Sequence, residues 1–342
     1  MENKPSLVDV AVLVLFFNRP EPLAALFEEI RKARPGMLLL YQDGARSEKD
    51  IPGIEACRKI VENIDWECEV HRRYLTKNSG CDPANYDSQK WAFTLTDKCI
   101  FFEDDDVPSQ SFFRFCKELL DKYEDDPRVS MITGTNHDEV TKDVPYDYFF
   151  TANACITGWA TWKRVVDQWD DHRYAFLDDE YNMGQLAAAI KEKDFKSNFI
   201  DICRRHRAQG KAFYETLLQA QMILHSGLSI VPTRNMINNH GAQSTSTHIV
   251  GNNDQLPKGY RKLFSMKRYE VAFPLKHPPY VMEMPGYRDR VYKMLGCNHP
   301  WLKVLSSLEE LVYSIRRGNF RYIAKSIKNR FLILIGKRNT HY

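Results

Sequence analysis

Apolar runs and amphipathic stretches alternate along the first hundred residues of this chain. The apolar runs have the length of buried strands and end in polar turn residues, whereas the stretches between them repeat their apolar positions with the period of a helix. This alternation predicts βαβ units, and therefore an α/β fold with a mainly parallel sheet flanked by helices. The predicted strands cover residues 8–17, 37–46, 67–75 and 99–102, and the predicted helices cover residues 22–33, 50–64 and 82–97.

The pattern continues less regularly beyond residue 110. We expect one α/β domain over residues 1–255, a Pro-rich connector over 256–300 and a basic, amphipathic helical tail over 301–342. Within the domain the periodicity predicts a helix at 111–126, a strand at 128–136, a Gly-Trp turn that starts a helix at 155–169, a helix at 212–227, a strand at 228–232 and then a polar loop.

Four consecutive carboxylates at 103–106 directly follow the predicted strand at 99–102. Such a concentration of charge at a strand end calls for a cation, and carboxylate oxygens suit Mg²⁺ or Mn²⁺. Open α/β sheets bind ligands at the carboxyl ends of their strands, so Asn18, Asp43 and Asn78 are expected to line the same sheet edge. The alternative is that the acidic residues mark a solvated turn.

The composition is ordinary for a globular enzyme. The 342 residues are 43% hydrophobic and 27% charged, which allows a substantial core. Eight cysteines without CxxC or zinc-like spacing indicate buried thiols in a reducing compartment. The first apolar run is interrupted by Asp9, has no small-residue cleavage site and is too short to span a membrane, so we expect a cytoplasmic or peripheral protein.

The net charge of +3 is distributed unevenly. From residue 311 onward the chain has eight Lys or Arg and no Asp or Glu, so residues 1–310 are net acidic. A basic amphipathic tail predicts contact with an anionic membrane surface, and the alternative is a helix packed on the domain with a solvated basic face. Nucleic-acid binding is not expected, because the positive charge lies outside the proposed active domain.

Three motifs, taken together and in order, resemble a known enzyme family. They are FNRP at 17–20, EDD at 103–105 and GWATWKR at 158–164. Over about residues 8–250 the chain is similar to the GT-A glycosyltransferases, which are Rossmann-like enzymes that use nucleotide sugars. The resemblance implies a GT-A fold and a requirement for Mn²⁺ or Mg²⁺.

The resemblance also implies a donor site. Asp43 would contact the nucleotide base or ribose, and Asp104 would face the ribose or a diphosphate-bound water. Taken alone, Asp43 is equally consistent with an Asx turn before Gly44. The residues expected beside the nucleotide are Asn18, Arg19, Asn78 and Gly80.

The acidic cluster would supply metal ligands. In the EDD register Asp105 is the direct ligand and Glu103 takes the other outer position, whereas a DxD register would use Asp104 and Asp106. His248 is the candidate for a further ligand. The ion would stabilise the charge that develops on the departing nucleoside diphosphate.

An inverting transfer needs a carboxylate that deprotonates the acceptor hydroxyl. The resemblance implies Glu215 for this role, although an acid in the first turn of a helix is also favoured by the macrodipole. The acidic residues at 178–180 are a second candidate. Trp159 is expected either to stack on the sugar as the floor of its pocket or to belong to the core.

These features predict a metal-dependent, inverting glycosyltransferase. It would move a sugar from a nucleoside diphosphate donor, most simply a UDP-sugar, to a glycan or lipid-linked glycan acceptor in the synthesis of surface polysaccharide. One alternative is a sugar nucleotidyltransferase, although FFNRP lacks the Gly-rich loop such enzymes usually have after the first strand. The other is a non-catalytic module that binds nucleotide sugars or glycans.

Overall fold

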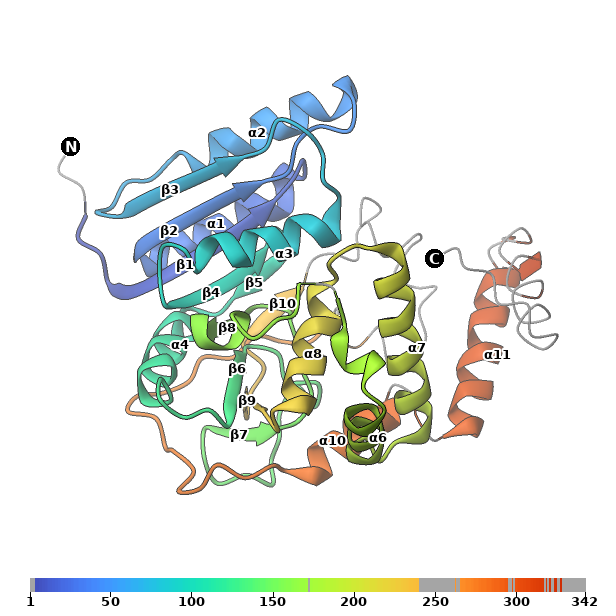
Figure 1. Ribbon diagram of the computed structural model, residues 1–342. Helices are drawn as coiled ribbons and strands as arrows, with labels where there is room; N and C mark the ends of the chain where they lie inside the picture. The colour runs from blue at the N-terminus through green and yellow to red at the C-terminus, as the bar shows by residue number, and fades with distance from the viewer. Residues whose placement is uncertain are drawn as a thin grey trace.

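An eight-stranded sheet in the order β3-β2-β1-β4-β8-β6-β9-β7 forms the centre of the molecule (Figure 1). The computed structural model describes residues 4–171, 173–239, 265–294 and 299–316, with the single positions 262, 297, 318, 320, 323, 324 and 327. The strands are β1 (Val8–Phe16), β2 (Pro35–Gln42), β3 (Glu69–Tyr74), β4 (Lys98–Glu103), β6 (Val129–Thr133), β7 (Tyr148–Thr151), β8 (Trp159–Trp162) and β9 (Leu228–Pro232).

The first four strands of the sheet are parallel. β1 pairs with β2 on one side and with β4 on the other, so that Leu13 lies between Leu39 and Phe101. β3 extends the sheet beyond β2. Helices cover both faces here, which explains why β1 reads as a continuous apolar run without alternation. The predicted α/β class, a mainly parallel sheet flanked by helices, is confirmed.

The second half of the sheet contains antiparallel strands that the periodicity did not predict. β8 runs antiparallel between β4 and β6, and β7 runs antiparallel to β9 at the edge. The prediction that residues 155–169 form a turn and then a helix is therefore wrong for Trp159–Trp162, whose four side chains are all buried. Only the single-turn helix α5 (Lys163–Val166) follows β8.

Helices cover the two faces of the parallel half. α1 contacts α2 and α4 on one face, whereas α3 contacts β1 and α8 on the other (Figure 1). The helices are α1 (Pro20–Ala33), α2 (Ile51–Val61), α3 (Cys81–Ala92), α4 (Gln110–Lys122), α6 (Glu180–Ala189), α7 (Lys193–Gln209), α8 (Tyr214–Leu224), α10 (Pro285–Met294) and α11 (Pro300–Arg316), and short 3₁₀ turns lie at Glu48–Asp50 and Ala175–Asp178.

The sequence of α1 shows why a helix forms there. A proline occupies its first position, where the missing N–H costs nothing. Leu23, Leu26, Phe27 and Ile30 follow at helical spacing, and all four are buried against the sheet.

A small antiparallel ribbon continues from the acidic cluster. β5 (Asp106–Pro108) pairs with β10 (Ile237–Asn239), which places Asp106 opposite Asn239. The beginning of the predicted polar loop after residue 232 is therefore a strand. Residues 240–261, including His248, lie outside the described part of the chain.

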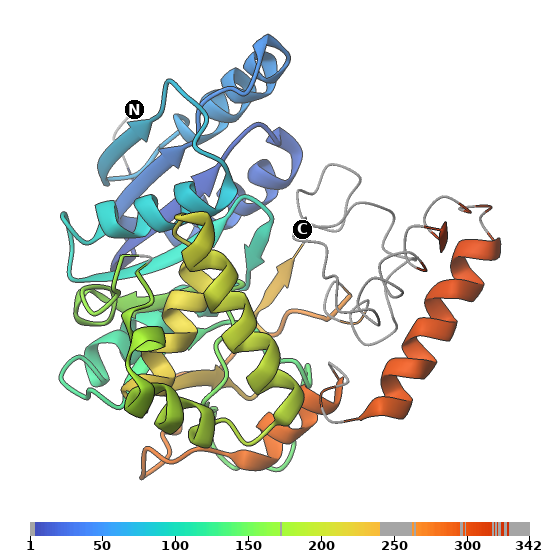
Figure 2. The same ribbon diagram turned by 45° about the vertical axis from the view of Figure 1, so that its right-hand side comes forward.

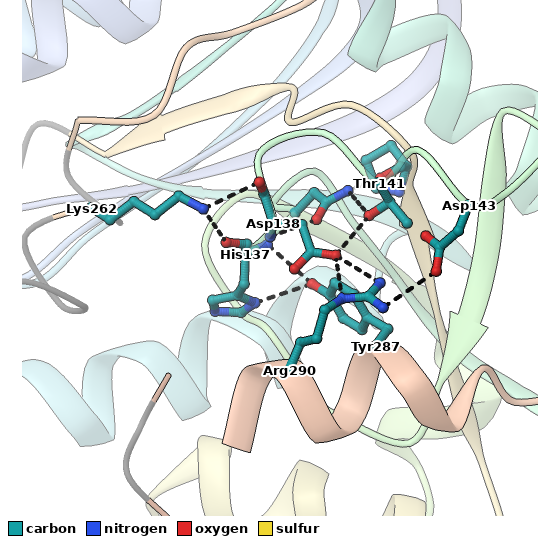
Figure 3. A network of polar contacts seen from close by, with 9 residues as sticks. His137, Asp138, Thr141, Asp143, Lys262, Tyr287 and Arg290 are labelled. Carbon is teal, nitrogen blue, oxygen red and sulfur yellow. Dashed lines mark hydrogen bonds and ion pairs between the residues drawn. The ribbon is translucent and has the colours of Figure 1, made fainter. Parts of the chain in front are cut away.

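The segment at 265–294, predicted as part of a connector, contacts the sheet domain closely. Tyr287 of α10 is buried, and its ring lies 4.7 Å from that of Phe149. Figure 3 shows Arg290 of α10 bound to Asp138 in the loop that follows β6, with 2.9 Å between Arg290 Nε and Asp138 Oδ2. The amide of His137 donates to the Tyr287 hydroxyl at 3.0 Å.

All eight cysteines lie in the described residues and none is in a disulfide, and four of them are buried. Among the described residues, no helix is both long enough and apolar enough to cross a membrane. The last long helix, α11, stands beside the body of the molecule (Figure 2).

Candidate functional site

A cavity of about 230 Å³ lies at the carboxyl ends of β1, β2 and β4. After β1 the chain moves to β2 on one side, whereas β4 occupies the other side, so this is a topological switch point where α/β proteins bind ligands. Eight of the eleven residues predicted for the site line the cavity. These are Asn18, Arg19, Asp43, Asn78, Gly80, Glu103, Asp104 and Asp105.

Asp43 holds the turn that forms one wall of this cavity. Its Oδ1 accepts hydrogen bonds from the amides of Gly44 at 2.9 Å and Ser79 at 2.8 Å. Its Oδ2 accepts from Asn78 Nδ2 at 2.8 Å and from the Gly80 amide at 3.0 Å. Both carboxylate oxygens are thus engaged by the protein, in agreement with the Asx-turn alternative. Asp43 therefore shapes the cavity indirectly, because its hydrogen bonds fix the turn at 78–80.

Two glycines permit this arrangement. A Cβ on Gly44 would lie 2.4 Å from the backbone carbon of Lys77, so the two chain segments approach each other too closely for any side chain. Gly80 has φ of +89°, a backbone conformation that L residues rarely adopt. The turn that carries Asn78 therefore depends on Gly80 within it and on Gly44 in the segment that packs against Lys77.

Asp50 fixes two polar residues at another part of the lining. It accepts a hydrogen bond from Asn18 Nδ2 at 2.7 Å and further bonds from the backbone amide, Nε and Nη2 of Arg46. The hydrogen bonds from Arg46 hold the pKa of Asp50 at about 2. Arg46 stays largely exposed, with 61% of its side-chain surface accessible, so it offers a cation at the cavity.

Arg19 lies against the acidic cluster. Its Nε donates to Asp104 Oδ2 at 3.2 Å, its Nη2 donates to Asp104 Oδ1, and the same Nη2 donates to Asp105 Oδ2 at 2.9 Å. Both aspartates are buried. Burial raises the pKa of Asp104 to about 6, although the charge of Arg19 opposes that shift. Among the described residues, the positive charge in contact with the acidic end of β4 is therefore the guanidinium group of Arg19.

The other acidic residues have different partners. Asp106 Oδ2 accepts from the Gly158 amide at 3.0 Å, and its Oδ1 accepts from Asn239 Nδ2 at 3.0 Å. Asp106 therefore joins the cluster to β8 and β10 and does not line the cavity. Glu103 accepts a long hydrogen bond of 3.4 Å from the Tyr214 hydroxyl, and burial raises its pKa well above the ordinary value.

The chemistry of this oxygen set fits a divalent cation. The cavity lining carries four carboxyl groups and two guanidinium groups, so the acidic side chains outnumber the basic ones that could pair with them. Among the described residues no three His, Cys, Asp or Glu side chains converge as a complete metal centre. An ion held here would therefore need ligands in addition to these protein carboxylates, as is common for Mg²⁺.

Glu215 lies near this cluster but not in the cavity lining. It is the second residue of α8 and lies in the first turn. This place agrees both with a catalytic base and with an acid that only stabilises the helix start. Burial raises its pKa to about 7. Burial also raises the pKa of Cys81, a lining residue, to about 12, and the charges of Glu103 and Glu215 add to that shift. Glu215 is thus close enough to act electrostatically on the cavity wall.

Trp159 and the acidic residues at 178–180 do not line the cavity, and their contacts give them roles in the fold. Trp159 is only 2% exposed, and its ring is stacked between those of Phe101 and Tyr214, as the core alternative expects. Asp179 caps α6 by accepting a hydrogen bond from the Asn182 amide at 3.0 Å. The acidic residues at 178–180 therefore mark the start of this helix.

Sequence reasoning missed several lining and supporting residues. Arg46 ends the QDGAR segment, and its position three residues after Asp43 could have identified it. Asn85 and Cys81 line the cavity from α3. Asn239 Nδ2 donates to Asp105 Oδ1 at 3.2 Å from a strand that follows more than a hundred residues later, a contact that no local pattern signals.

The comparisons with known proteins leave the family open. No family model matches the chain, and no curated protein matches it either. The chain resembles several solved structures at about 10% identity. These include the inositol-1-phosphate CTP transferase from T. maritima (10% identity, 78% of this chain and 100% of that chain, TM-score 0.36), mouse xyloside xylosyltransferase 1 (11%, 66% and 85%, 0.32) and 4-diphosphocytidyl-2C-methyl-D-erythritol synthase from Anaerococcus prevotii (10%, 56% and 84%, 0.29). TM-scores this low assign no activity to the chain.

Proposed function

We propose that this chain is a glycosyltransferase that moves a sugar from a nucleoside diphosphate sugar to a glycan or lipid-linked glycan. One observation carries the proposal: a single cavity at the switch point of the sheet is lined by residues from the FNRP, QDGAR and EDD segments together. These segments are separated by tens of residues, and a binding site explains why polar groups gather there. The synthesis of surface polysaccharide is the setting that we infer for such an enzyme.

The donor would bind with its phosphates toward Arg19 and Arg46 and its nucleoside toward the Asn78 turn. Arg19 already pairs with Asp104 and Asp105, so a diphosphate has to compete with those carboxylates for the guanidinium group. Glu103 and Asp105 are the residues that would hold a Mn²⁺ or Mg²⁺ ion. When bound, the ion supplies positive charge for the developing charge of the leaving group.

Glu215 would serve as the general base. A carboxylate with a pKa of about 7 is strong enough to accept a proton from an acceptor hydroxyl in the transition state and is ionised in half of the molecules at neutral pH. Its place in the first turn of α8, beside the Tyr214 that contacts Glu103, supports an approach of the acceptor from the α8 side. An inverting transfer requires such a base on the acceptor hydroxyl, so inversion is part of the proposal.

Nucleotide binding tests the proposal without knowledge of the sugar or the acceptor. Thermal unfolding is measured with UDP, GDP and CDP, each with and without Mn²⁺. We expect one nucleotide, most simply UDP, to raise the midpoint, and Mn²⁺ to increase that shift, because a ligand of the folded state stabilises it. Asp105→Ala should abolish the effect of Mn²⁺, whereas Asp125→Ala, at an exposed position after α4, should leave it unchanged.

Absence of any nucleotide-dependent shift would overturn the donor site. An unchanged Mn²⁺ effect in Asp105→Ala would remove Asp105 as a ligand. Release of pyrophosphate from a nucleoside triphosphate and a sugar 1-phosphate would identify a nucleotidyltransferase instead. Nucleotide-sugar binding without hydrolysis or transfer to any glycan acceptor would indicate a non-catalytic module.

A further inference from the structure

Seven apolar side chains of α11 form a stripe that faces solvent. Their exposed fractions range from 38% to 79%. The stripe consists of Trp301, Val304, Leu305, Leu308, Leu311, Val312 and Ile315. This apolar face of α11 is therefore not covered by the domain.

The spacing of these residues concentrates them on one side of the helix. At about 100° per residue the seven positions fall within an arc of about 120°, which is the width of a face that is normally buried. Contiguous exposed apolar surface of this kind marks an interaction site. Trp301 at 79% exposure is far more accessible than Trp159 or Trp162, which are 2% exposed.

The chain that follows the stripe supplies a second observation. From residue 311 to the C-terminus there are eight Lys or Arg and no acidic residue. Basic clusters next to an amphipathic helix are attracted to anionic lipid surfaces, and the helix buries its apolar face at the level of the headgroups. Since the described helices include none that can span a bilayer, the contact would be interfacial.

We propose that the α11 stripe docks on an anionic lipid surface and thereby holds the enzyme beside lipid-linked acceptors. The docking itself goes beyond the proposed transferase activity and does not depend on it. Trp301 would lie at the interface, and the basic charge of the sequence after residue 311 would add attraction to anionic lipid.

A second copy of the chain fits the stripe less well. Trp301, Val304, Leu308, Leu311 and Ile315 have the alternating spacing of three and four residues found in coiled coils. The neighbouring positions 305 and 312 are apolar, however, where coiled coils usually carry charges that pair between helices. The stripe also covers only about two heptads, and two basic tails side by side would repel each other.

Vesicle binding of the full chain tests the proposal. Co-sedimentation is measured with vesicles of phosphatidylcholine alone and with vesicles that contain an equal share of phosphatidylglycerol. We expect binding to the anionic vesicles, a blue shift of tryptophan emission that is lost in Trp301→Phe, and weakening by salt. Leu308→Glu should reduce the partition coefficient roughly tenfold or more, because a leucine that the lipid would bury is replaced by a charge.

Ser307→Glu is the matched control, since it adds the same charge one residue away and off the apolar face. It should bind vesicles much more tightly than Leu308→Glu, while thermal unfolding and nucleotide binding stay the same in both variants. Equal vesicle binding by the two variants, or equal binding to neutral and anionic vesicles, would overturn the proposal. So would a wild-type dimer in sedimentation velocity without vesicles that Leu308→Glu converts to a monomer, because the stripe would then cover a second copy.

Discussion

Arg19 donates from Nε and Nη2 to both carboxylate oxygens of Asp104, a residue 85 positions later in the chain. The pair joins the loop after β1 to the end of β4 at the edge where the candidate cavity lies. Asp104 retains 5% of its side-chain exposure and Arg19 retains 19%, so water screens the pair poorly. This ion pair is part of the fold, and Arg19 is a cation in direct contact with the acidic cluster.

Removal of the guanidinium group should destabilise the protein. Arg19→Ala leaves Asp104 and Asp105 buried without their cation, and we expect the free energy of unfolding at pH 7 to fall by roughly 3 kcal/mol. Urea denaturation measures this loss. The loss should shrink at lower pH, because protonation removes the uncompensated charge.

A double-mutant cycle separates the pair from other effects of truncation. Arg19→Ala combined with Asp104→Asn should cost less than the sum of the two single changes, since the second change removes the charge that the first left unpaired. Additive losses would mean that the two groups do not stabilise each other in solution.

Asp43 should affect stability and nucleotide binding together. Asp43→Asn replaces one acceptor oxygen by a donor that faces N–H groups of the turn at 78–80, and we expect a loss of roughly 2 kcal/mol in the free energy of unfolding. Glu55→Gln, at an exposed position of α2, should change stability by less than about 0.5 kcal/mol. Weaker nucleotide binding with unchanged stability would contradict a positioning role and indicate direct contact with the ligand.

Two glycine substitutions should have opposite effects. Gly44→Ala places a Cβ against the backbone of Lys77, which cannot move like a side chain, and should cost roughly 2 kcal/mol. Gly184→Ala lies inside α6 with no heavy atom within 4 Å of the new Cβ, so it should stabilise by about 0.5 to 1 kcal/mol. Thermal unfolding of both variants checks the pair, and a neutral Gly44→Ala would refute the close approach.

Glu215 should make stability depend on pH. Its pKa is about 7 in the folded protein and about 4.5 in the unfolded chain, so the folded state holds more protons between these values. Stability should therefore fall as pH rises from about 4.5 to about 7, and Glu215→Gln should remove that part of the slope. Glu180→Gln, at an exposed position, should keep the wild-type slope. Identical slopes in all three proteins would contradict a raised pKa of Glu215.

Turnover should also depend on the ionisation of Glu215, but it should rise with pH where stability falls. As a base, Glu215 acts when ionised, so the rate of transfer should rise as pH increases through about 7. Glu215→Gln should lower turnover by roughly 10²- to 10⁴-fold while the affinity for the nucleotide is kept. A loss of nucleotide binding in this variant would instead assign Glu215 a structural role.

The sequence by itself determined the local elements of the parallel half. Continuous apolar runs predicted β1, β2 and β4, because strands covered on both faces need apolar side chains in every position. Helical periodicity predicted α1 and α4, because a helix that packs on a sheet needs apolar side chains along the one face that it buries. Polar residues at strand ends, such as Asn18 and Asp43, predicted the sheet edge where the cavity lies, since parallel strands end at the same edge.

Only the tertiary structure decided which groups meet. β8 is a four-residue antiparallel strand, and its identity depends on the hydrogen bonds that β4 and β6 offer to it, which no periodicity within Trp159–Trp162 reveals. The partner of Asp104 depends on how β1 and β4 pair, so the sequence predicted a cation but could not identify it as Arg19. The sequence also could not decide whether the apolar face of α11 is exposed, because the spacing of apolar residues is the same whether the face packs on a domain or contacts solvent.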